Sequence, residues 1–144
     1  MTIFGNILCC TDFSGRSETA FDKALALAQR EDARLTLLHV VVPNTPLLPG
    51  NHIKPHKKTP FPEIAQRITD FVEENYRPKA CGYEFNLALR RGHPMVEILE
   101  HIKKNENDLV ILGSEGLEGV GLYVLGSVAE RVSRNAPCSC LVVR

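Results

Sequence analysis

Residues 108–134 read DLVILGSEGLEGVGLYVLGSVAERVSR and combine three features that decide the fold. An apolar run at residues 109–112 ends at Gly113, a glycine-rich stretch follows, and a helical pattern begins at Ser127. The apolar run has the length and composition of a buried strand. Backbone N–H groups at the start of a helix lack partners and carry the positive end of the helix dipole, so they attract anions. The stretch therefore predicts a strand, a loop of low side-chain bulk and a helix N-terminus that together form an anion-binding cradle.

The glycines and the serine of this stretch have two explanations. Gly113 and Gly116 let the backbone approach a ligand where a Cβ atom would obstruct it, and Gly126 does the same at the start of the helix. Ser127 then offers an N–H group and a hydroxyl to a phosphate. Ser127 and Glu130 also have the spacing of a capping box, which stabilises a helix with no ligand present. The residues alone leave both explanations open.

Strand and helix patterns alternate along the rest of the chain. The expected strands are residues 3–11, 34–42, 83–90, 109–112 and 139–143. The third strand alternates apolar and polar side chains, which is typical of an edge strand. Four helical segments separate the strands: one after the turn at 12–17, one at 63–79, one from Pro94, expected to turn Val96, Leu99 and Ile102 inward, and one from Ser127. This order predicts an α/β fold with a parallel sheet and right-handed crossovers.

The composition fits one compact cytoplasmic domain spanning residues 1–144. Lys+Arg and Asp+Glu number 17 each, so no net charge favours nucleic acid or an anionic membrane as a partner. No apolar run is long enough for a membrane span, and no charged leader precedes one. The 5 cysteines, an odd number, favour a reducing compartment over a disulfide framework. The Cys138-x-Cys140 pair lacks the further ligands of a zinc site, so we expect no metal and small core residues instead.

Residues 43–62 interrupt the alternation of strands and helices. Most of the 9 prolines lie here, at a density that forbids both a helix and a paired strand. The segment is also locally basic, because it contains His52, Lys54 and the run 56–58, His-Lys-Lys. We expect a flexible loop, either a plain surface connection or a flap that brings positive charge to a bound phosphate.

The glycine spacing resembles that of the universal stress protein family, in the branch that binds nucleotides. Gly113, Gly116, Gly126 and Ser127 match the Gly-x2-Gly-x9-Gly-Ser signature of that branch. Residues 7–14, ILCCTDFS, followed by an alanine-rich helical pattern, are similar to the first strand and turn of the family. The resemblance covers essentially the whole chain. It implies a doubly wound, Rossmann-like sheet of strand order 3-2-1-4-5 flanked by four helices, with the loops after strands 1 and 4 facing one crevice.

The resemblance also implies which residues contact an adenine nucleotide. Asp12 and Val40 would contact the adenosine part, and Gly113 would lie near the ribose. The phosphates would be held by Gly116, Gly126, Ser127 and Val128. The Asp12 carboxylate can accept hydrogen bonds from ribose hydroxyls or the adenine amino group, and Thr11 could add one hydroxyl contact. An Asx turn or a helix cap is the alternative role of Asp12.

Three residues depart from the family pattern and oppose a triphosphate. Glu115 stands where the family often has His or Arg, Leu117 stands where it often has a basic residue, and Glu118 follows directly. Two carboxylates beside a triphosphate repel it unless they point away or share a divalent cation. Arg16 or the basic loop could compensate. The expected ligand is therefore ATP or AMP. ATP would bind together with Mg2+, and the two carboxylates would repel AMP less than ATP.

Three functions are compatible with these observations: a nucleotide-binding regulatory domain in the stress response, an interaction module that has lost the nucleotide, and a slow ATP hydrolase of the kind the family sometimes shows. No P-loop, nucleophile elbow or catalytic base is identifiable, so we expect no enzyme. His39 is expected in the core and His93 at an exposed turn. Residues 140–143 would form an exposed apolar edge in a monomer, and the resemblance implies that a homodimer forms through this strand.

Overall fold

The computed structural model describes residues 1–43, 48, 59–114 and 125–144. Its elements, in chain order, are β1 (Asn6–Cys10), α1 (Gly15–Glu31), β2 (Arg34–Val41), α2 (Phe61–Asn75), the short 3-10 helix η1 (Arg77–Ala80), β3 (Asn86–Arg91), α3 (Pro94–Asn105), β4 (Leu109–Gly113), α4 (Ser127–Asn135) and β5 (Ser139–Val143). Most of the proline-rich segment lies outside the described residues. So does the part of the glycine stretch that contains Glu115, Gly116, Leu117 and Glu118.

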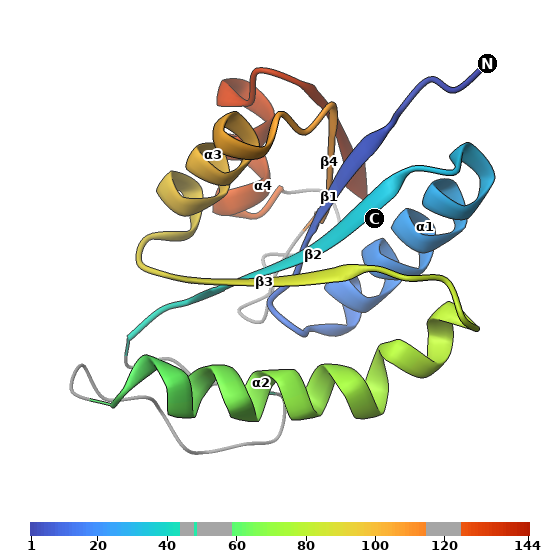
Figure 1. Cartoon of the computed structure of the whole chain (residues 1–144). Coiled ribbons are helices and arrows are strands. Elements are labelled where there is room, and N and C mark those ends of the chain that lie inside the picture. The colour runs from blue at the N-terminus through green and yellow to red at the C-terminus, as the bar shows by residue number, and fades with distance from the viewer. Residues whose placement is uncertain (44–47, 49–58, 115–124) are drawn as a thin grey trace.

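The five strands form one parallel sheet in the order β3-β2-β1-β4-β5, which confirms the predicted topology (Figure 1). In β1, Cys9 lies opposite Leu37 of β2 on one side and opposite Ile111 of β4 on the other. The direction of winding reverses between β1 and β4. Folds of this kind bind ligands outside the carboxyl ends of the two strands at that switch point.

Helices cover both faces of the sheet, with α1 and α2 on one face and α3 and α4 on the other (Figure 1). Side chains of β1 alternate between the two cores: Ile7 and Cys9 pack toward α1 and α2, and Leu8 and Cys10 pack toward α3 and α4. Both faces of β1 are therefore covered by helices and shielded from solvent. This explains why its sequence is a continuous apolar run rather than an alternating one.

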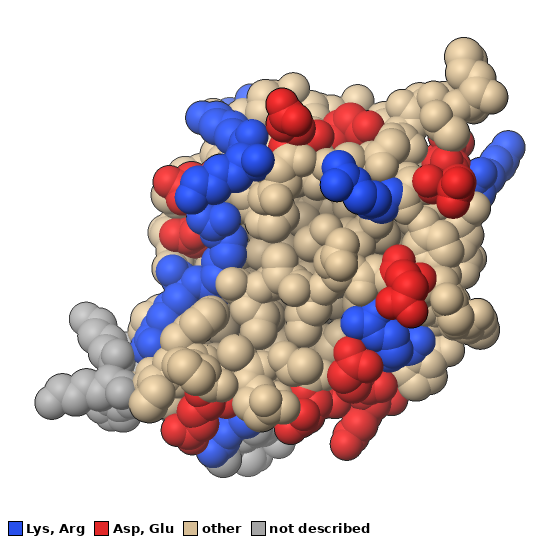
Figure 2. Space-filling view, viewed as in Figure 1, with Lys and Arg blue, Asp and Glu red and all other residues tan. Residues whose placement is uncertain are grey.

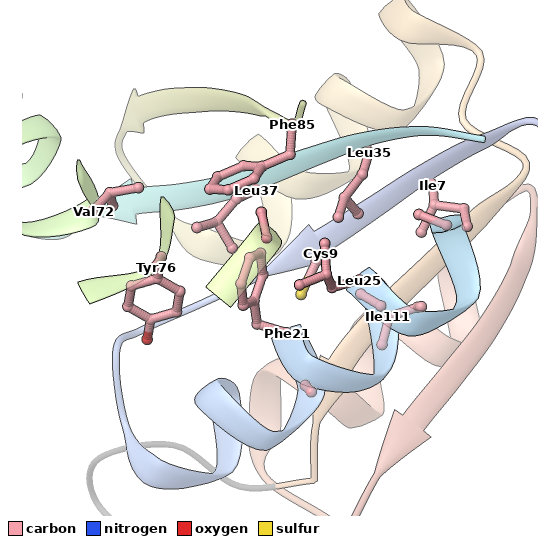
Figure 3. Close-up of a cluster of buried hydrophobic side chains, with 14 of the residues drawn as sticks. Ile7, Cys9, Phe21, Leu25, Leu35, Leu37, Val72, Tyr76, Phe85 and Ile111 are labelled. Carbon is pink, nitrogen blue, oxygen red and sulfur yellow. The ribbon is translucent and has the colours of Figure 1, made fainter. Parts of the chain in front are cut away.

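The larger core is aromatic where α1 meets the segment after α2. The Phe21 ring contacts the rings of Tyr76 and Phe85, with centroid separations of 5.0 and 5.2 Å (Figure 3). The buried face of α1 otherwise carries mostly small residues at three- and four-residue spacing, namely Ser17, Ala20, Ala24, Leu25 and Ala28. Small residues let α1 lie close to the sheet, so the helix begins directly beside the ends of β1 and β4.

Several predicted bounds were too wide, each for a visible reason. β1 begins at Asn6 because the N–H groups of Ile3 and Phe4 bond to the Glu31 carboxylate instead of to a strand. The predicted helix to residue 79 ends at Asn75 and continues only as η1, where Pro78 has no N–H group to extend the α-helix.

The buried face of α3 differs from the predicted one. Ile98, His101 and Ile102 are buried, whereas the Val96 side chain is 45% exposed. Val96 and Ile102 are six residues apart, which places them about 120° apart around a helix of 3.6 residues per turn. The expectation that Val96 points inward was therefore wrong, while Ile102 is buried as predicted.

The cysteines are free, and they divide into buried and accessible ones. Cys9 and Cys10 are buried, Cys138 and Cys140 are half-buried, and Cys81 is exposed. Burial raises the pKa of the Cys9 thiol to about 12 and that of Cys10 well above its ordinary value, so both stay protonated. Within the described part of the chain, no group of three or more His, Cys, Asp or Glu side chains is arranged to hold a metal ion.

Both signs of charge are spread over the surface. Figure 2 shows Lys and Arg side chains gathered along one side, over α3 and the end of β3, with acidic side chains beside them and an uncharged centre. Arg90 of β3 contacts Glu97 at 2.6 Å and Glu100 at 3.0 Å, so part of this positive charge is neutralised locally. None of the helices in the described segments combines the length and apolarity needed to cross a membrane.

Candidate functional site

The turn after β1 is built around the Asp12 carboxylate. Asp12 Oδ1 accepts hydrogen bonds from the Ser14 N–H at 2.9 Å and from the Ser17 hydroxyl at 2.6 Å. Ser14 is the N-cap of α1, and its hydroxyl accepts from the Ser17 N–H at 3.3 Å. Of the two structural roles predicted for Asp12, the Asx turn is thus present, while the cap of α1 is Ser14 and not Asp12. A carboxylate offers about four acceptor positions, so this structural role does not by itself exclude a ligand.

Sequence reasoning missed Phe13, the residue between Asp12 and Ser14. Phe13 has a φ of 63°, a left-handed conformation that costs a non-glycine residue roughly 1–2 kcal/mol. Its ring is buried, and its N–H donates to Thr11 Oγ1 at 2.9 Å. The available signal was a large apolar residue inside an otherwise polar turn, which indicates that the turn is anchored in the core.

His39 lies buried behind the same turn. Its Nδ1 is 2.8 Å from the carbonyl oxygen of Thr11, so the tautomer with a proton on Nδ1 donates a hydrogen bond there. Burial lowers the pKa of His39, opposed in part by the Thr11 hydrogen bond and the nearby charge of Asp12. His39 is therefore neutral at pH 7 and belongs to the core, as predicted. His93 is exposed at the start of α3, also as predicted.

The carboxyl end of β4 packs directly on the start of α1. A Cβ atom added to Gly113 would lie 3.1 Å from both the carbonyl carbon and the carbonyl oxygen of Arg16. This contact disfavours a Cβ atom at position 113 whether or not a ligand binds. It also fixes the first turn of α1 against β4, so the Asp12 turn and the end of β4 are held beside each other. The expected place of Gly113 near a ribose stays a prediction.

The start of α4 differs from the predicted capping box. Gly126 is the N-cap, and its carbonyl oxygen accepts from the Glu130 N–H at 3.0 Å. Ser127 is consequently the first helical residue, one position too late to cap the helix. Glu130 instead contacts Arg134 at 3.0 Å. The capping-box explanation was wrong, and no side chain of the described residues caps the first turn of α4.

Ser114 joins the start of α4 to the sheet. Its N–H donates to the carbonyl oxygen of Val143 in β5 at 2.8 Å, and its carbonyl oxygen accepts from the Gly126 N–H at 2.5 Å. The first turn of α4 therefore lies next to the carboxyl end of β4, although most of the chain between them lies outside the described residues. Sequence reasoning did not single out Ser114, because its role rests on backbone groups that any residue possesses.

The predicted site residues lie as follows. Thr11 and Asp12 follow β1, Gly113 ends β4, and Gly126, Ser127 and Val128 begin α4. Val40 is buried near the end of β2, where it pairs with Arg90 of β3. Gly116 is outside the described residues. Two short contacts hold these elements: the Thr11 N–H donates to the carbonyl oxygen of Leu38 in β2 at 2.9 Å, and Gly113 of β4 meets Arg16 in α1.

These features define a class of protein: a doubly wound α/β domain whose switch point carries a carboxylate turn on one side and, on the other, a helix N-terminus that no side chain of the described residues caps. Residues 4–144 match the Universal stress protein family, and the chain belongs to that family.

Individual relatives agree with this membership. The universal stress protein YxiE of Bacillus subtilis is 31% identical over 148 residues, which cover 99% of this chain and 100% of that protein. Among solved structures, the universal stress protein UspA from Lactobacillus plantarum superposes with a TM-score of 0.77 at 26% identity and covers 98% of both chains. A universal stress protein in complex with cAMP superposes with a TM-score of 0.66 at 24% identity, covering 98% of this chain and 97% of the other.

Replacing Gly113 by alanine should destabilise the protein by about 1–3 kcal/mol, because the new Cβ meets backbone atoms of Arg16 that cannot move aside cheaply. Urea unfolding followed by circular dichroism measures the change. Gly15→Ala is the matched control. Gly15 begins α1, the helix that contains Arg16, and no atom lies within 4 Å of a Cβ atom added there. Equal effects of the two substitutions would contradict the packing argument.

Protonation of His39 should weaken the fold at acidic pH. The folded-state pKa lies below the ordinary value of 6.5, so the unfolded chain binds more protons as the pH falls below about 6.5. The contribution of His39 is therefore complete above that pH and is lost progressively below it. His39→Asn keeps a donor for Thr11 without a titrating group, and its urea stability should fall less than that of the wild type between pH 7.5 and 5.5. His101, whose pKa burial and Arg90 also lower, is common to both proteins. Parallel pH profiles would refute this role of His39.

Proposed function

We propose that this chain is a cytoplasmic regulatory domain that binds an adenine nucleotide in the stress response and is not an enzyme. The observation that carries the proposal is the start of α4, which has no side-chain cap in the described residues and is tied by Ser114 to the carboxyl end of β4. A helix N-terminus of this kind favours a phosphate by two effects at once, unpaired N–H donors and the helix dipole.

The Asp12 turn supplies the second half of the site. Asp12 is only partly buried, and its carboxylate is held in one orientation by the Ser14 N–H and the Ser17 hydroxyl. An ordered carboxylate is suited to accept hydrogen bonds from sugar hydroxyls or from an exocyclic amino group. A ligand that spans the switch point would then have hydroxyl or amino donors at the Asp12 end and an anion at the α4 end. A nucleotide has both.

The charge of the site favours one phosphate over three. Glu115 and Glu118 are close in sequence to the expected phosphate-binding glycines and add two negative charges there. Each additional phosphate increases the repulsion unless Mg2+ is shared. One universal stress protein of this fold has been solved in complex with cAMP, an adenine nucleotide with a single phosphate. We therefore place AMP or cAMP ahead of ATP, and we expect ATP to need Mg2+.

A second candidate function is a homodimeric interaction module without a nucleotide. Two observations favour it: Asp12 already has a structural role in the turn, and the packing against Arg16 explains Gly113. In this alternative the cradle is retained for folding, and function resides on the outer surface.

The test between them is a nucleotide measurement on the purified protein. Denatured protein is first searched for co-purified nucleotide by mass spectrometry, and AMP, cAMP and ATP are then titrated by calorimetry with and without Mg2+. We expect micromolar binding of AMP or cAMP, and a loss of about tenfold or more in Gly126→Val, because a branched side chain at the cap obstructs the approach of a phosphate. Asn135→Val, at the exposed far end of α4, is the control. An empty protein that binds none of the three ligands would establish the interaction module instead.

We further propose a homodimer formed through β5. This strand is an edge of the sheet, and Leu141 in its middle is 40% exposed. Exposed apolar edges are normally covered. Size-exclusion chromatography with light scattering should give twice the chain mass at micromolar concentration, and Leu141→Lys should shift the protein toward the monomer. Val96 is a similarly exposed apolar side chain on α3, so Val96→Lys is the matched control. A wild-type monomer would rule out the dimer.

A further inference from the structure

We propose that Phe13 is a positioning residue of the nucleotide site. An aromatic box, formed by buried His39 and Tyr76 and half-buried Phe71, holds the Phe13 ring and thereby keeps the backbone of residue 13 in the left-handed conformation that aims the Asp12 carboxylate. The inference rests on the proposed function, since the ligand that Asp12 would meet is the nucleotide. It goes further by identifying what sets the orientation of that carboxylate.

The backbone of Phe13 is unusual for its place in the fold. Four non-glycine residues of the described chain have positive φ: Phe13, Asp32, Cys81 and Glu106. Three of them are C-caps, at the ends of α1, η1 and α3, where a left-handed residue commonly ends a helix. Phe13 instead precedes a helix, immediately beside the candidate site. Helix termination therefore does not explain its conformation, and another cause is required.

That cause is the burial of the ring. The Phe13 side chain is 4% exposed, and its ring centroid lies 4.6 Å from His39, 5.2 Å from Phe71 and 5.7 Å from Tyr76. These partners come from β2, from α2 and from the residue that follows α2. A return of φ to the ordinary negative range would swing the ring out of this box. Burial and ring contacts thus offset the strain of the backbone.

The hydrogen bonds on either side of Phe13 link its backbone conformation to the orientation of the Asp12 carboxylate. Before it, Thr11 Oγ1 accepts the Phe13 N–H at 2.9 Å. After it, the Ser14 N–H donates to Asp12 Oδ1 at 2.9 Å, and this bond reaches back across residue 13. Because the Asp12–Ser14 bond spans residue 13, the φ of residue 13 sets the direction from which the Ser14 N–H meets the Asp12 carboxylate. Phe13 therefore acts through Asp12 and does not contact the ligand itself.

A double-mutant cycle tests this mechanism, with AMP as the probe and calorimetry as the measurement. Phe13→Leu should weaken binding about tenfold, comparable to the loss of one hydrogen bond to a charged group, and Asp12→Asn should do the same. The double variant should bind no more weakly than Asp12→Asn alone, because Phe13 acts only through that carboxylate. Phe85→Leu removes an equally buried ring from the same core, but one that packs on Phe21 and not on Phe13, so it should leave the affinity nearly unchanged. Additive losses in the cycle, or equal losses in Phe13→Leu and Phe85→Leu, would overturn the proposal.

A second readout does not depend on the nucleotide. Amide hydrogen exchange of Ser14 reports its bond to Asp12, and Phe13→Leu should lower its protection about tenfold more than Phe85→Leu does, while the amide of Leu37 in the core changes equally in both. If Phe13→Leu does not fold, Phe13→Met replaces it. A wild-type protein that binds no AMP would refute the proposed function, and the exchange of Ser14 would still decide whether Phe13 holds the turn. Unchanged protection of Ser14 would show that it does not.

Discussion

The pairing of β1 with strands on both sides, and its burial on both faces, is the constraint on which the rest of the structure depends. Cys9 has Leu37 on one side and Ile111 on the other, and each of its neighbours in β1 faces one of the two cores. A strand buried in this way has no freedom to slip, because a shift of one residue would exchange its two apolar faces. Its carboxyl end is consequently a fixed point.

The candidate site inherits its rigidity from that fixed point. The turn after β1 is anchored to β2 through the Thr11 N–H, to the core through the Phe13 ring, and to α1 through the cap at Ser14. On the other side of the switch point, Gly113 allows β4 to touch the backbone of Arg16, and Ser114 ties the start of α4 to β5. Each of these links uses backbone atoms or buried rings, which are stiff, rather than long surface side chains.

The sequence allowed the elements to be predicted more fully than the site. Apolar runs and helical periodicity located the strands and helices, because burial on the sheet imposes those patterns. The strand order came from the resemblance to a family, since pattern alone does not say which strands pair. Val96 was wrongly expected to be buried because residues spaced three apart shift progressively around a helix of 3.6 residues per turn. The capping box was wrong because the spacing of Ser127 and Glu130 does not specify whether the glycine or the serine is the N-cap. The apolar side chain of Phe13 in a polar turn was a signal of burial, but its left-handed backbone could not be predicted, since the sign of φ depends on tertiary contacts.

The structural role of Asp12 in the turn and its proposed role in ligand binding are compatible, because the first prepares the carboxylate for the second. A carboxylate free to rotate would lose conformational entropy when it met a ligand, and it would be hydrated until then. The bonds from Ser14 and Ser17 order it before any ligand arrives, which lowers the entropic cost of binding. The same argument applies to Gly113, whose contact with α1 holds the two sides of the switch point together. The stability of the turn and the affinity proposed for the site then depend on the same contacts. The effect of a substitution on ligand affinity is therefore interpretable only where the stability of the turn is unchanged.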